Sequence, residues 1–180
     1  MNGIILCQSK YGASRRYAEW IAEETGFRIT ETKKADIKEV AKYDVIILGG
    51  GVYASSITGI AFLKKNIGEL AGKKIYVFCC GAAPYDEELV EGIRKRNLSG
   101  ALADIPLFYY QGMWDLNGMK FADRTMCKMY VKMLSKKDPS EIKAWERPFF
   151  EARDKKCDWT DKKFIAPLIE MIKGKGEEKC

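Results

Sequence analysis

Histidine is absent from this sequence. Its absence excludes a Ser-His-Asp triad, a histidine-ligated zinc or haem, and general-base catalysis by imidazole. We therefore predict no metal site and assign no catalytic side chain. The six cysteines lack both C-x-x-C spacing and the pattern of a small secreted scaffold, so we expect reduced thiols. Cys7, Cys79 and Cys80 are expected to pack inside strands as small hydrophobic residues.

Long apolar runs are also missing. Charged residues interrupt every stretch well before the roughly 18 to 20 residues that cross a bilayer. The first residues carry no basic segment followed by an apolar stretch, as a secretory signal would. We therefore expect a cytoplasmic protein. No G-x-x-x-x-G-K-S/T string occurs, which disfavours an ATPase.

Short apolar runs do occur, and they alternate with segments of helical periodicity, as in a parallel sheet covered by helices. The 180 residues, 47% of them hydrophobic, suit one domain spanning residues 1–180. The predicted strands are 3–8, 27–32, 44–48, 74–80 and 105–110. The predicted helices are 14–25, 36–42, 59–70, 86–97, 121–135, 141–155 and 160–173, the last capped by Asp158 or Thr160.

More chain follows the fifth strand than one helix and a loop would use, since about 70 residues remain. We therefore predict a helical insertion at residues 113–157. Within it, Met126, Met129, Tyr130 and Met133 share a helical spacing, which predicts an amphipathic helix. Beyond the last helix, the charged residues 175–180 are expected to fray.

The stretch Ser9-Lys10-Tyr11-Gly12-Ala13-Ser14 lies between the first strand and the first helix. A phosphate there would accept hydrogen bonds from loop amides and serine hydroxyls and would face the positive end of the helix. An ordinary turn with a serine cap is the alternative.

Two further loops are expected at the same edge of the sheet. Residues 49–55 and 81–86 each combine small residues with one aromatic residue, Tyr53 and Tyr85. This composition suits a flat ring lying against backbone between two tyrosines. Each tyrosine taken singly is equally a half-buried loop residue.

These residues resemble those of flavodoxin-like FMN proteins, because S-K-Y-G-A-S stands where flavodoxins carry S/T-x-T-G-x-T, with Tyr11 replacing the usual threonine. The resemblance covers residues 3–112 and the final helix. It implies a three-layer sandwich of a five-stranded parallel sheet, order 2-1-3-4-5, and FMN as cofactor. It also places Gly50 and Gly51 where a backbone peptide reorients toward reduced flavin. The implied cofactor-binding residues are Ser9, Lys10, Tyr11, Gly12, Ala13, Ser14, Gly50, Gly51, Val52, Tyr53, Ala54, Gly81, Ala82, Ala83, Tyr85 and Trp114.

Trp114 either closes over the flavin or packs in the core. Segment 121–133 and the late Asp158-Trp159 resemble the menaquinone-dependent protoporphyrinogen dehydrogenase branch of the same superfamily. The resemblance implies an FMN-dependent oxidoreductase whose partners are a redox protein, a quinone or a porphyrinogen. An electron carrier without its own substrate and a non-catalytic flavodoxin-fold interaction module are the alternatives.

A competing motif is the G-x-G-x-x-A spacing of residues 49–54, which also fits a dinucleotide-binding turn. That turn would normally follow the first strand, with an acidic residue ending the second strand. Here the motif follows the third strand, and Glu69, about 20 residues on, falls in a predicted helix. A nicotinamide-binding fold is therefore disfavoured.

The net charge and its distribution help to distinguish the remaining candidate functions. The formal net charge is +6 and the pI is near 8.9, which favours an anionic partner, and we expect no nucleic-acid partner. A basic stripe recurs every fourth residue of the predicted insertion helix, at Lys120, Arg124, Lys128, Lys132 and Lys136. The stripe is either a solvated face or a peripheral contact with an anionic membrane surface at the inner face of the membrane.

Overall fold

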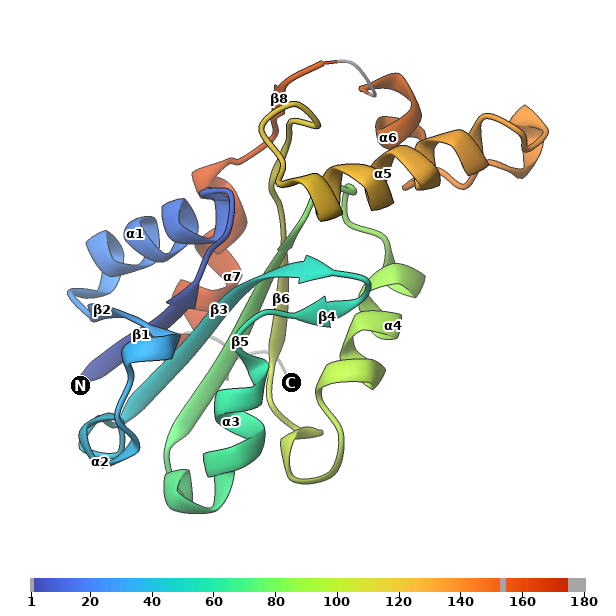
Figure 1. Cartoon of the computed structure of the whole chain (residues 1–180). Coiled ribbons are helices and arrows are strands. Elements are labelled where there is room, and N and C mark those ends of the chain that lie inside the picture. Colours follow the sequence, from blue (N-terminus) through green and yellow to red (C-terminus); the bar gives the residue numbers. More distant parts are fainter. Residues whose placement is uncertain (1, 153–154, 175–180) are drawn as a thin grey trace.

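The computed structural model describes residues 2–152 and 155–174 (Figure 1). Its strands are β1 (Gly3–Gln8), β2 (Arg28–Glu31), β3 (Val45–Tyr53), β4 (Ser56–Ile57), β5 (Lys74–Gly81), β6 (Leu107–Gln111), β7 (Met113–Trp114) and β8 (Cys157–Asp158). Its α-helices are α1 (Ala13–Thr25), α2 (Ile37–Val40), α3 (Ile60–Asn66), α4 (Glu87–Asn97), α5 (Phe121–Leu134), α6 (Arg147–Glu151) and α7 (Ala166–Ile172). Short 3-10 helices are η1 (Thr32–Lys34), η2 (Ile67–Leu70), η3 (Gly100–Leu102), η4 (Pro139–Glu141) and η5 (Lys162–Ile165). The predicted frayed segment 175–180 lies outside the described residues.

The main sheet has the order β2-β1-β3-β5-β6, and these strands are all parallel. Because β4 is a short addition paired antiparallel to β3, this order is the predicted 2-1-3-4-5 of the five parallel strands. The α/β flavodoxin-like fold class is thereby confirmed. The carboxyl ends of β1, β3 and β5 are neighbours, since Gln8 pairs with Gly50 and Gly51 pairs with Cys80.

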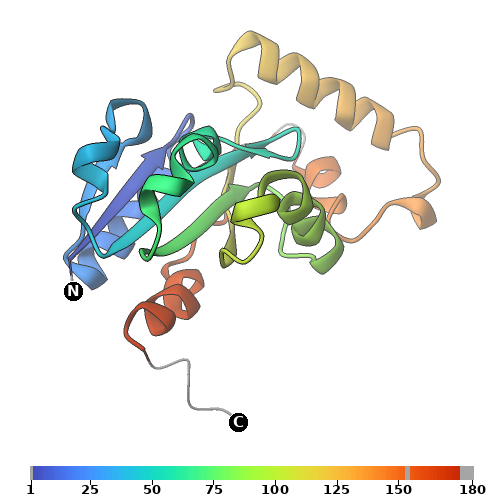
Figure 2. The ribbon, with the colours of Figure 1, turned by 90° about the horizontal axis from the view of Figure 1, so that it is seen from below.

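Alternate residues of the central strands face two separate halves of the core. Ile4 and Leu6 pack with α2, α3 and α4 on one face of the sheet. Ile5 and Cys7 pack with α1 and α7 on the other face (Figure 2). Both faces are covered, which explains why the central strands are continuous apolar runs rather than alternating ones.

The third strand is longer than the sequence predicted. We expected a loop at residues 49–55, but β3 continues to Tyr53 and turns into β4 through Ala54 and Ser55, which both have positive φ, 47° and 61°. The glycines are in the strand because neighbours fill the space of a side chain. A Cβ on Gly49 would lie 2.0 Å from the ring of Phe78, and one on Gly50 would lie 2.1 Å from the carbonyl oxygen of Thr58.

The segment between β6 and α7 extends over the carboxyl end of the sheet. Its two ends pair antiparallel as β7 and β8, and α5 and α6 lie beyond them, above the tip of the β3–β4 hairpin (Figure 1). We call the residues from Met113 to Cys157 the insertion, as in the sequence prediction. Within the described part of the chain, no helix combines the length and hydropathy needed to cross a membrane.

In this region one predicted helix and one predicted helix cap are wrong. A helix over 141–155 is replaced by η4 and the short α6, because Pro148 lies in the first turn of α6 and cannot continue a helix from upstream. The last helical segment begins at Lys162 rather than residue 160, and its cap is Asp161, whose carboxylate accepts the Lys163 N–H at 2.9 Å. Asp158 instead binds Arg16, at 2.5 Å.

Candidate functional site

A cavity of about 450 Å³ lies at the carboxyl ends of β1, β3 and β5. One wall, which we call the body wall, comes from the strand ends and the loops that follow them. The opposite wall, which we call the insertion wall, comes from the chain between Met113 and Phe149. The predicted residues that line the cavity are Ser9, Lys10, Tyr11, Ala13, Ser14, Gly51, Val52, Tyr53, Ala54, Gly81, Ala82, Ala83 and Trp114. Gly12, Gly50 and Tyr85 were also predicted but do not line it.

The loop between β1 and α1 has the geometry of an anion site. Gly12 adopts φ 101°, which favours glycine, and α1 begins at the next residue. The Gly12 N–H donates a hydrogen bond to Ser9 Oγ at 3.2 Å. The first N–H groups of an α-helix have no partner within the helix, so those of α1 are available at this loop. Ser14 is buried, and its hydroxyl hydrogen-bonds to the thiol of Cys80.

Tyr11 replaces a threonine of the flavodoxin motif, and the structure shows where its hydroxyl goes. It donates a hydrogen bond to the Asp123 carboxylate and accepts one from the Lys120 N–H at 3.1 Å. Both partners belong to the insertion. The hydroxyl at this position therefore joins the loop to α5 instead of facing the inside of the loop.

The tip of the β3–β4 hairpin carries Tyr53 to the edge of the cavity. The ammonium of Lys10 lies 5.2 Å from the centre of the Tyr53 ring, and the ring of Tyr11 meets it edge-on at 6.2 Å. The backbone of Gly51 is held on both sides, because its N–H donates to Thr58 Oγ1 at 2.9 Å and its carbonyl accepts the Thr58 N–H at 2.9 Å.

This bonding bears on the expectation, implied by the resemblance, that the Gly50-Gly51 peptide reorients. Both glycines are paired within the sheet, and reorienting their peptide would break the hydrogen bond from the Gly51 N–H to Thr58 Oγ1. The residues of the hairpin that leave extended geometry are Ala54 and Ser55.

The loop after β5 contributes small residues to the body wall, and it is held by Tyr109 of β6, a lining residue that the sequence missed. The hydroxyl of Tyr109 donates to the Ala83 carbonyl at 2.7 Å, and a Cβ on Gly81 would lie 2.4 Å from that hydroxyl. Tyr109 therefore fixes the path of this loop. Tyr85, predicted to face the ring, is 67% exposed and meets only the edge of Tyr109, at 6.5 Å.

The insertion wall is made of large apolar side chains, and Trp114 is the only one that the sequence predicted for the site. Trp114 is buried and packs edge-on against Phe149 at 5.1 Å, which in turn meets Tyr130 at 5.6 Å. The other lining residues of this wall include Met113, Met119, Asp123, Met126, Cys127 and Trp145. Helical spacing had put Met126 and Tyr130 on one face of α5, but nothing local in the sequence indicates which face meets the cavity.

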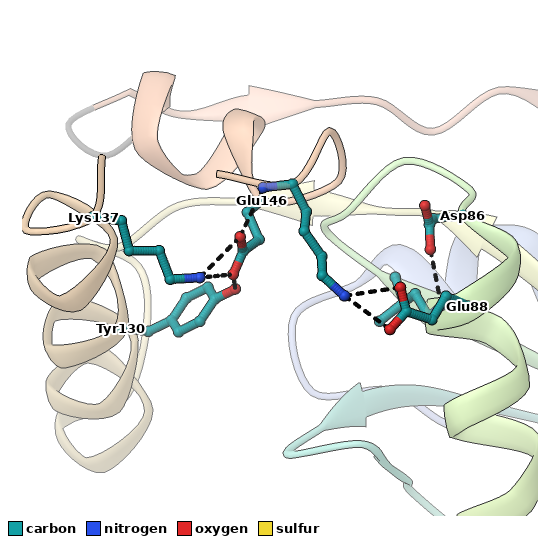
Figure 3. Close-up of polar contacts among 7 residues, drawn as sticks. Asp86, Glu88, Tyr130, Lys137 and Glu146 are labelled. Carbon is teal, nitrogen blue, oxygen red and sulfur yellow. Dashed lines mark hydrogen bonds and ion pairs between the residues drawn. The ribbon is translucent and has the colours of Figure 1, made fainter. Parts of the chain in front are cut away.

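A buried carboxylate supports this wall from behind (Figure 3). Glu146 accepts hydrogen bonds from Lys137 Nζ at 3.0 Å, from Tyr130 Oη at 3.1 Å and from the Lys143 N–H at 2.9 Å. The Lys143 ammonium reaches in the other direction and pairs with Glu88 of α4 at 2.8 Å. The insertion is thereby tied to the body of the fold at a point far from β7 and β8.

Among the ionisable groups that line the cavity, Asp123 and Cys80 have shifted pKa values that bear on the chemistry of the site. Hydrogen bonds from Lys10 and Tyr11 hold the pKa of the Asp123 carboxyl below its ordinary value, so this group is charged at neutral pH. Burial raises the pKa of the Cys80 thiol to about 12, so the sulfur keeps its proton. Cys80 is therefore a poor nucleophile here, in keeping with its predicted role as a packing residue.

The predicted basic stripe of α5 is interrupted at one position. Lys120, Lys128, Lys132 and Lys136 are exposed. The guanidinium of Arg124 instead donates to the carbonyls of Asn117 and Met119, at 2.9 and 2.8 Å. Arg124 therefore stabilises the loop that precedes α5. The neighbouring apolar face is open, because Met126, Met129 and Met133 are 49%, 68% and 47% exposed.

A family model described as a flavodoxin domain matches residues 4–141, so the chain belongs to the flavodoxin domain family. No curated protein matches the chain.

Solved structures with a similar fold include three whose names concern flavodoxins or flavoproteins. A WrbA-like flavodoxin from Agrobacterium tumefaciens is 18% identical, covering 84% of this chain and 97% of its own, with a TM-score of 0.43. A putative flavoprotein from Bacteroides eggerthii is 15% identical, covering 76% and 99%, with a TM-score of 0.45. Two-electron reduced flavodoxin from Megasphaera elsdenii is 17% identical, covering 61% and 82%, with a TM-score of 0.40.

Proposed function

We propose that this chain binds FMN in the cavity and acts as an oxidoreductase. The observation that carries the proposal is that the phosphate-type loop, the β3–β4 hairpin and the loop after β5 line one cavity of about 450 Å³. That volume lies within the roughly 300 to 1,000 Å³ typical of small-molecule sites. Membership of the flavodoxin domain family supports FMN as the ligand, since proteins of this fold typically bind it.

The residues present fit the two ends of FMN. The N–H groups at the start of α1, the Ser9 hydroxyl and the Lys10 ammonium would hold the phosphate, which favours a helix N-terminus. Tyr53 and the small residues of the body wall, such as Gly51 and Ala82, would lie against the ring. When bound, FMN supplies hydride or electron transfer, and the chain supplies binding, orientation and access.

The insertion wall favours an enzyme with a substrate of its own over an electron carrier. Trp114, Trp145 and Phe149, with Met119 and Met126, present a large apolar surface to the cavity. A largely apolar ring molecule would be shielded there from water while close to the flavin ring. We propose a porphyrinogen or a quinone as this molecule, as in a protoporphyrinogen dehydrogenase.

The exposed lysines on and just after α5 suggest that such a substrate is taken up at a membrane surface. Lys128, Lys132 and Lys136 lie on the outside of the insertion, beside the exposed Met129 and Met133. Cationic and apolar side chains together suit an anionic membrane surface. We propose that α5 makes a peripheral contact of this kind.

The proposed function is tested by adding FMN to purified protein and following flavin fluorescence. We expect quenching with saturable, one-to-one binding, and weaker binding of FAD, whose second phosphate and adenosine would have to pass the closed loop. Anaerobic turnover of the FMN complex with porphyrinogens, quinones and ferredoxin-type donors then separates the activities. No flavin binding would leave the interaction module as the better description, and flavin reduction without turnover of any small molecule would favour the electron carrier.

A further inference from the structure

The phosphate-type loop is already engaged by a carboxylate from another part of the chain. Asp123, in the first turn of α5, accepts the hydrogen bond of the Tyr11 hydroxyl and pairs with the Lys10 ammonium through the same oxygen. The two segments are 112 residues apart in the sequence. Lys10, Tyr11 and Asp123 all line the cavity. An anionic group of the insertion thus lies beside the loop proposed to hold an anionic ligand.

The surroundings of Asp123 are arranged for a negative charge. The side chain of Asp123 is 12% exposed, whereas that of Lys10 is 35% exposed. Lys10, Tyr11 and Lys120 are the charged or titratable groups that face this carboxylate from the loop and from the start of α5. Lys10 is the one positively charged side chain within the loop, so any second anion there must share it with Asp123.

A phosphate monoester carries a charge of about −1.5 to −2 at pH 7 and has three strong acceptor oxygens. It would outcompete a single carboxylate for the Lys10 ammonium. Once Lys10 turns to the phosphate, Asp123 would be left beside a second anion with only Tyr11 as a donor. Like charges at such separations repel strongly where water is partly excluded.

Resting on the proposed FMN function, we propose that Asp123 is a specificity-determining residue of the phosphate loop. Its carboxylate competes with the phosphate of FMN for Lys10. Binding of a phosphate-bearing flavin takes Lys10 from Asp123 and weakens the contact between the loop and the first turn of α5, which then depends on Tyr11 alone. An uncharged flavin leaves the contact intact. Occupation of the cofactor site is thereby linked to the position of the wall that faces the substrate.

If the contact between Lys10 and Asp123 had a different role, removing the charge of Asp123 would change the affinity for FMN in the opposite direction. If Asp123 merely oriented Lys10 toward the phosphate, removing its charge would loosen Lys10 and weaken the binding of FMN. If it competes, removing its charge strengthens that binding. The direction of the change in affinity therefore separates a competitor from a positioning residue.

The experiment compares wild type, Asp123→Asn and the matched control Glu141→Gln, which removes one exposed carboxylate of the insertion away from the loop. FMN and riboflavin are titrated against each by flavin fluorescence, after circular dichroism has shown that the variants are folded. For Asp123→Asn we expect at least tenfold tighter FMN binding and a change of less than twofold for riboflavin. Glu141→Gln should behave as wild type with both ligands.

A second measurement uses the wild-type protein, so that it does not depend on a variant that folds. Amide hydrogen exchange of residues 121–127 should become faster with saturating FMN and stay unchanged with riboflavin. Unchanged or weaker FMN binding by Asp123→Asn overturns the inference, as does slower exchange of residues 121–127 with FMN. Failure of FMN to bind any of the three proteins overturns the proposed function as well, and is distinguished by flat titrations throughout.

Discussion

The two walls of the cavity are built in different ways. The body wall consists mainly of backbone and small side chains at the ends of strands that pair along their whole length. The insertion wall consists of large side chains whose own core is small. In the described residues, the cluster behind it has Trp114, Leu116 and Ala152 as its buried members, whereas sixteen buried residues pack on each face of the sheet. The first wall is held by a sheet, the second by a few contacts.

The contacts that hold the insertion are mostly polar and lie at its edges. Asp123 joins it to the phosphate-type loop, Lys143 joins it to Glu88 of α4, and β7 pairs with β8 at its base. The Lys143–Glu88 pair is exposed, and exposed ion pairs contribute little to stability, about 0 to 1 kcal/mol each. The insertion should therefore open more readily than the sheet, which suits a wall that admits a substrate.

The largest expected effect is a loss of free energy of unfolding. One core substitution in the body of the fold and one in the insertion test whether the two parts differ in this respect. Phe78→Ala removes a ring that fills the space beside Gly49 and should lower the free energy of unfolding by about 3 to 5 kcal/mol. Trp114→Ala removes a side chain of similar burial but should mainly speed amide exchange within residues 113–158. Urea unfolding and hydrogen exchange measure the two effects. Equal losses in global stability would show that the walls unfold as one unit.

The next effect concerns the outer face of the insertion. Reversing Lys128, Lys132 and Lys136 to glutamate should lower the affinity for anionic vesicles by a hundredfold or more, at about 1 kcal/mol for each basic residue near the surface. Arg124 is left unchanged because its guanidinium stabilises the loop before α5. Co-sedimentation with anionic and neutral vesicles measures the change.

The matched control for this prediction is on the body of the fold. Lys64, Lys65 and Lys74 are exposed, and reversing them changes the net charge by the same amount. This control should retain more vesicle affinity than the α5 variant. If both triple variants bind equally, net charge alone governs the interaction and the stripe on α5 is only a solvated face.

A smaller effect is expected from pH, and it runs in opposite directions in the body of the fold and in the insertion. Rising pH should destabilise the body, whereas falling pH should break the Asp123 contact of the insertion. Burial raises the pKa values of Cys7 and Cys80 in the body from 9.0 to about 12. Their contribution to stability is therefore complete below pH 9 and is lost as pH rises toward 12. Between pH 9 and 10 we expect a loss of about 1 kcal/mol for each thiol. Urea unfolding of wild type and Cys80→Ala tests this, because the variant should show a shallower slope.

On the insertion side, the lowered pKa of Asp123 gives the reverse dependence. Hydrogen bonds from Lys10 and Tyr11 lower this pKa below 3.8, so the contact is complete above about pH 4 and is lost as pH falls through the lowered value. The near-ultraviolet signal of Tyr11 and Tyr53 should therefore change in acid before the sheet unfolds. A single transition for both signals would contradict separate behaviour of the two regions.

The smallest effect is expected at the phosphate-type loop. Ser9→Ala should weaken FMN binding about fivefold, which corresponds to the loss of one hydrogen bond of about 1 kcal/mol. Riboflavin binding should not change. On the opposite wall, Tyr130→Phe should leave FMN affinity unaltered, because the Tyr130 hydroxyl is bonded to Glu146. If Tyr130→Phe costs as much as Ser9→Ala, the phosphate is held elsewhere than we propose.

Most of the sheet could be predicted because its signals are local. The strand of residues 3–8 was predicted with the bounds that β1 has, and the first helix was one residue short of α1, which is followed by Gly26 with φ 72°. Apolar runs between turn residues suffice for this. The hairpin at Ala54 and Ser55 was missed because three glycines in a row indicate a loop, whereas here they fit against Phe78 and Thr58.

The sequence by itself determined the α/β class and the location of the phosphate-type loop, because each depends on periodicity and residue type over a few neighbouring positions. The order of the parallel strands was implied by the resemblance to flavodoxin-like proteins, because pairing between distant strands leaves no local pattern. Only the tertiary structure decided which face of α5 meets the cavity, that Tyr11 and Lys10 are bonded to Asp123, and that Arg124 is not part of an exposed basic stripe. These contacts join segments distant in sequence. Their partners are set by how the insertion packs over the sheet, and no local pattern records that packing.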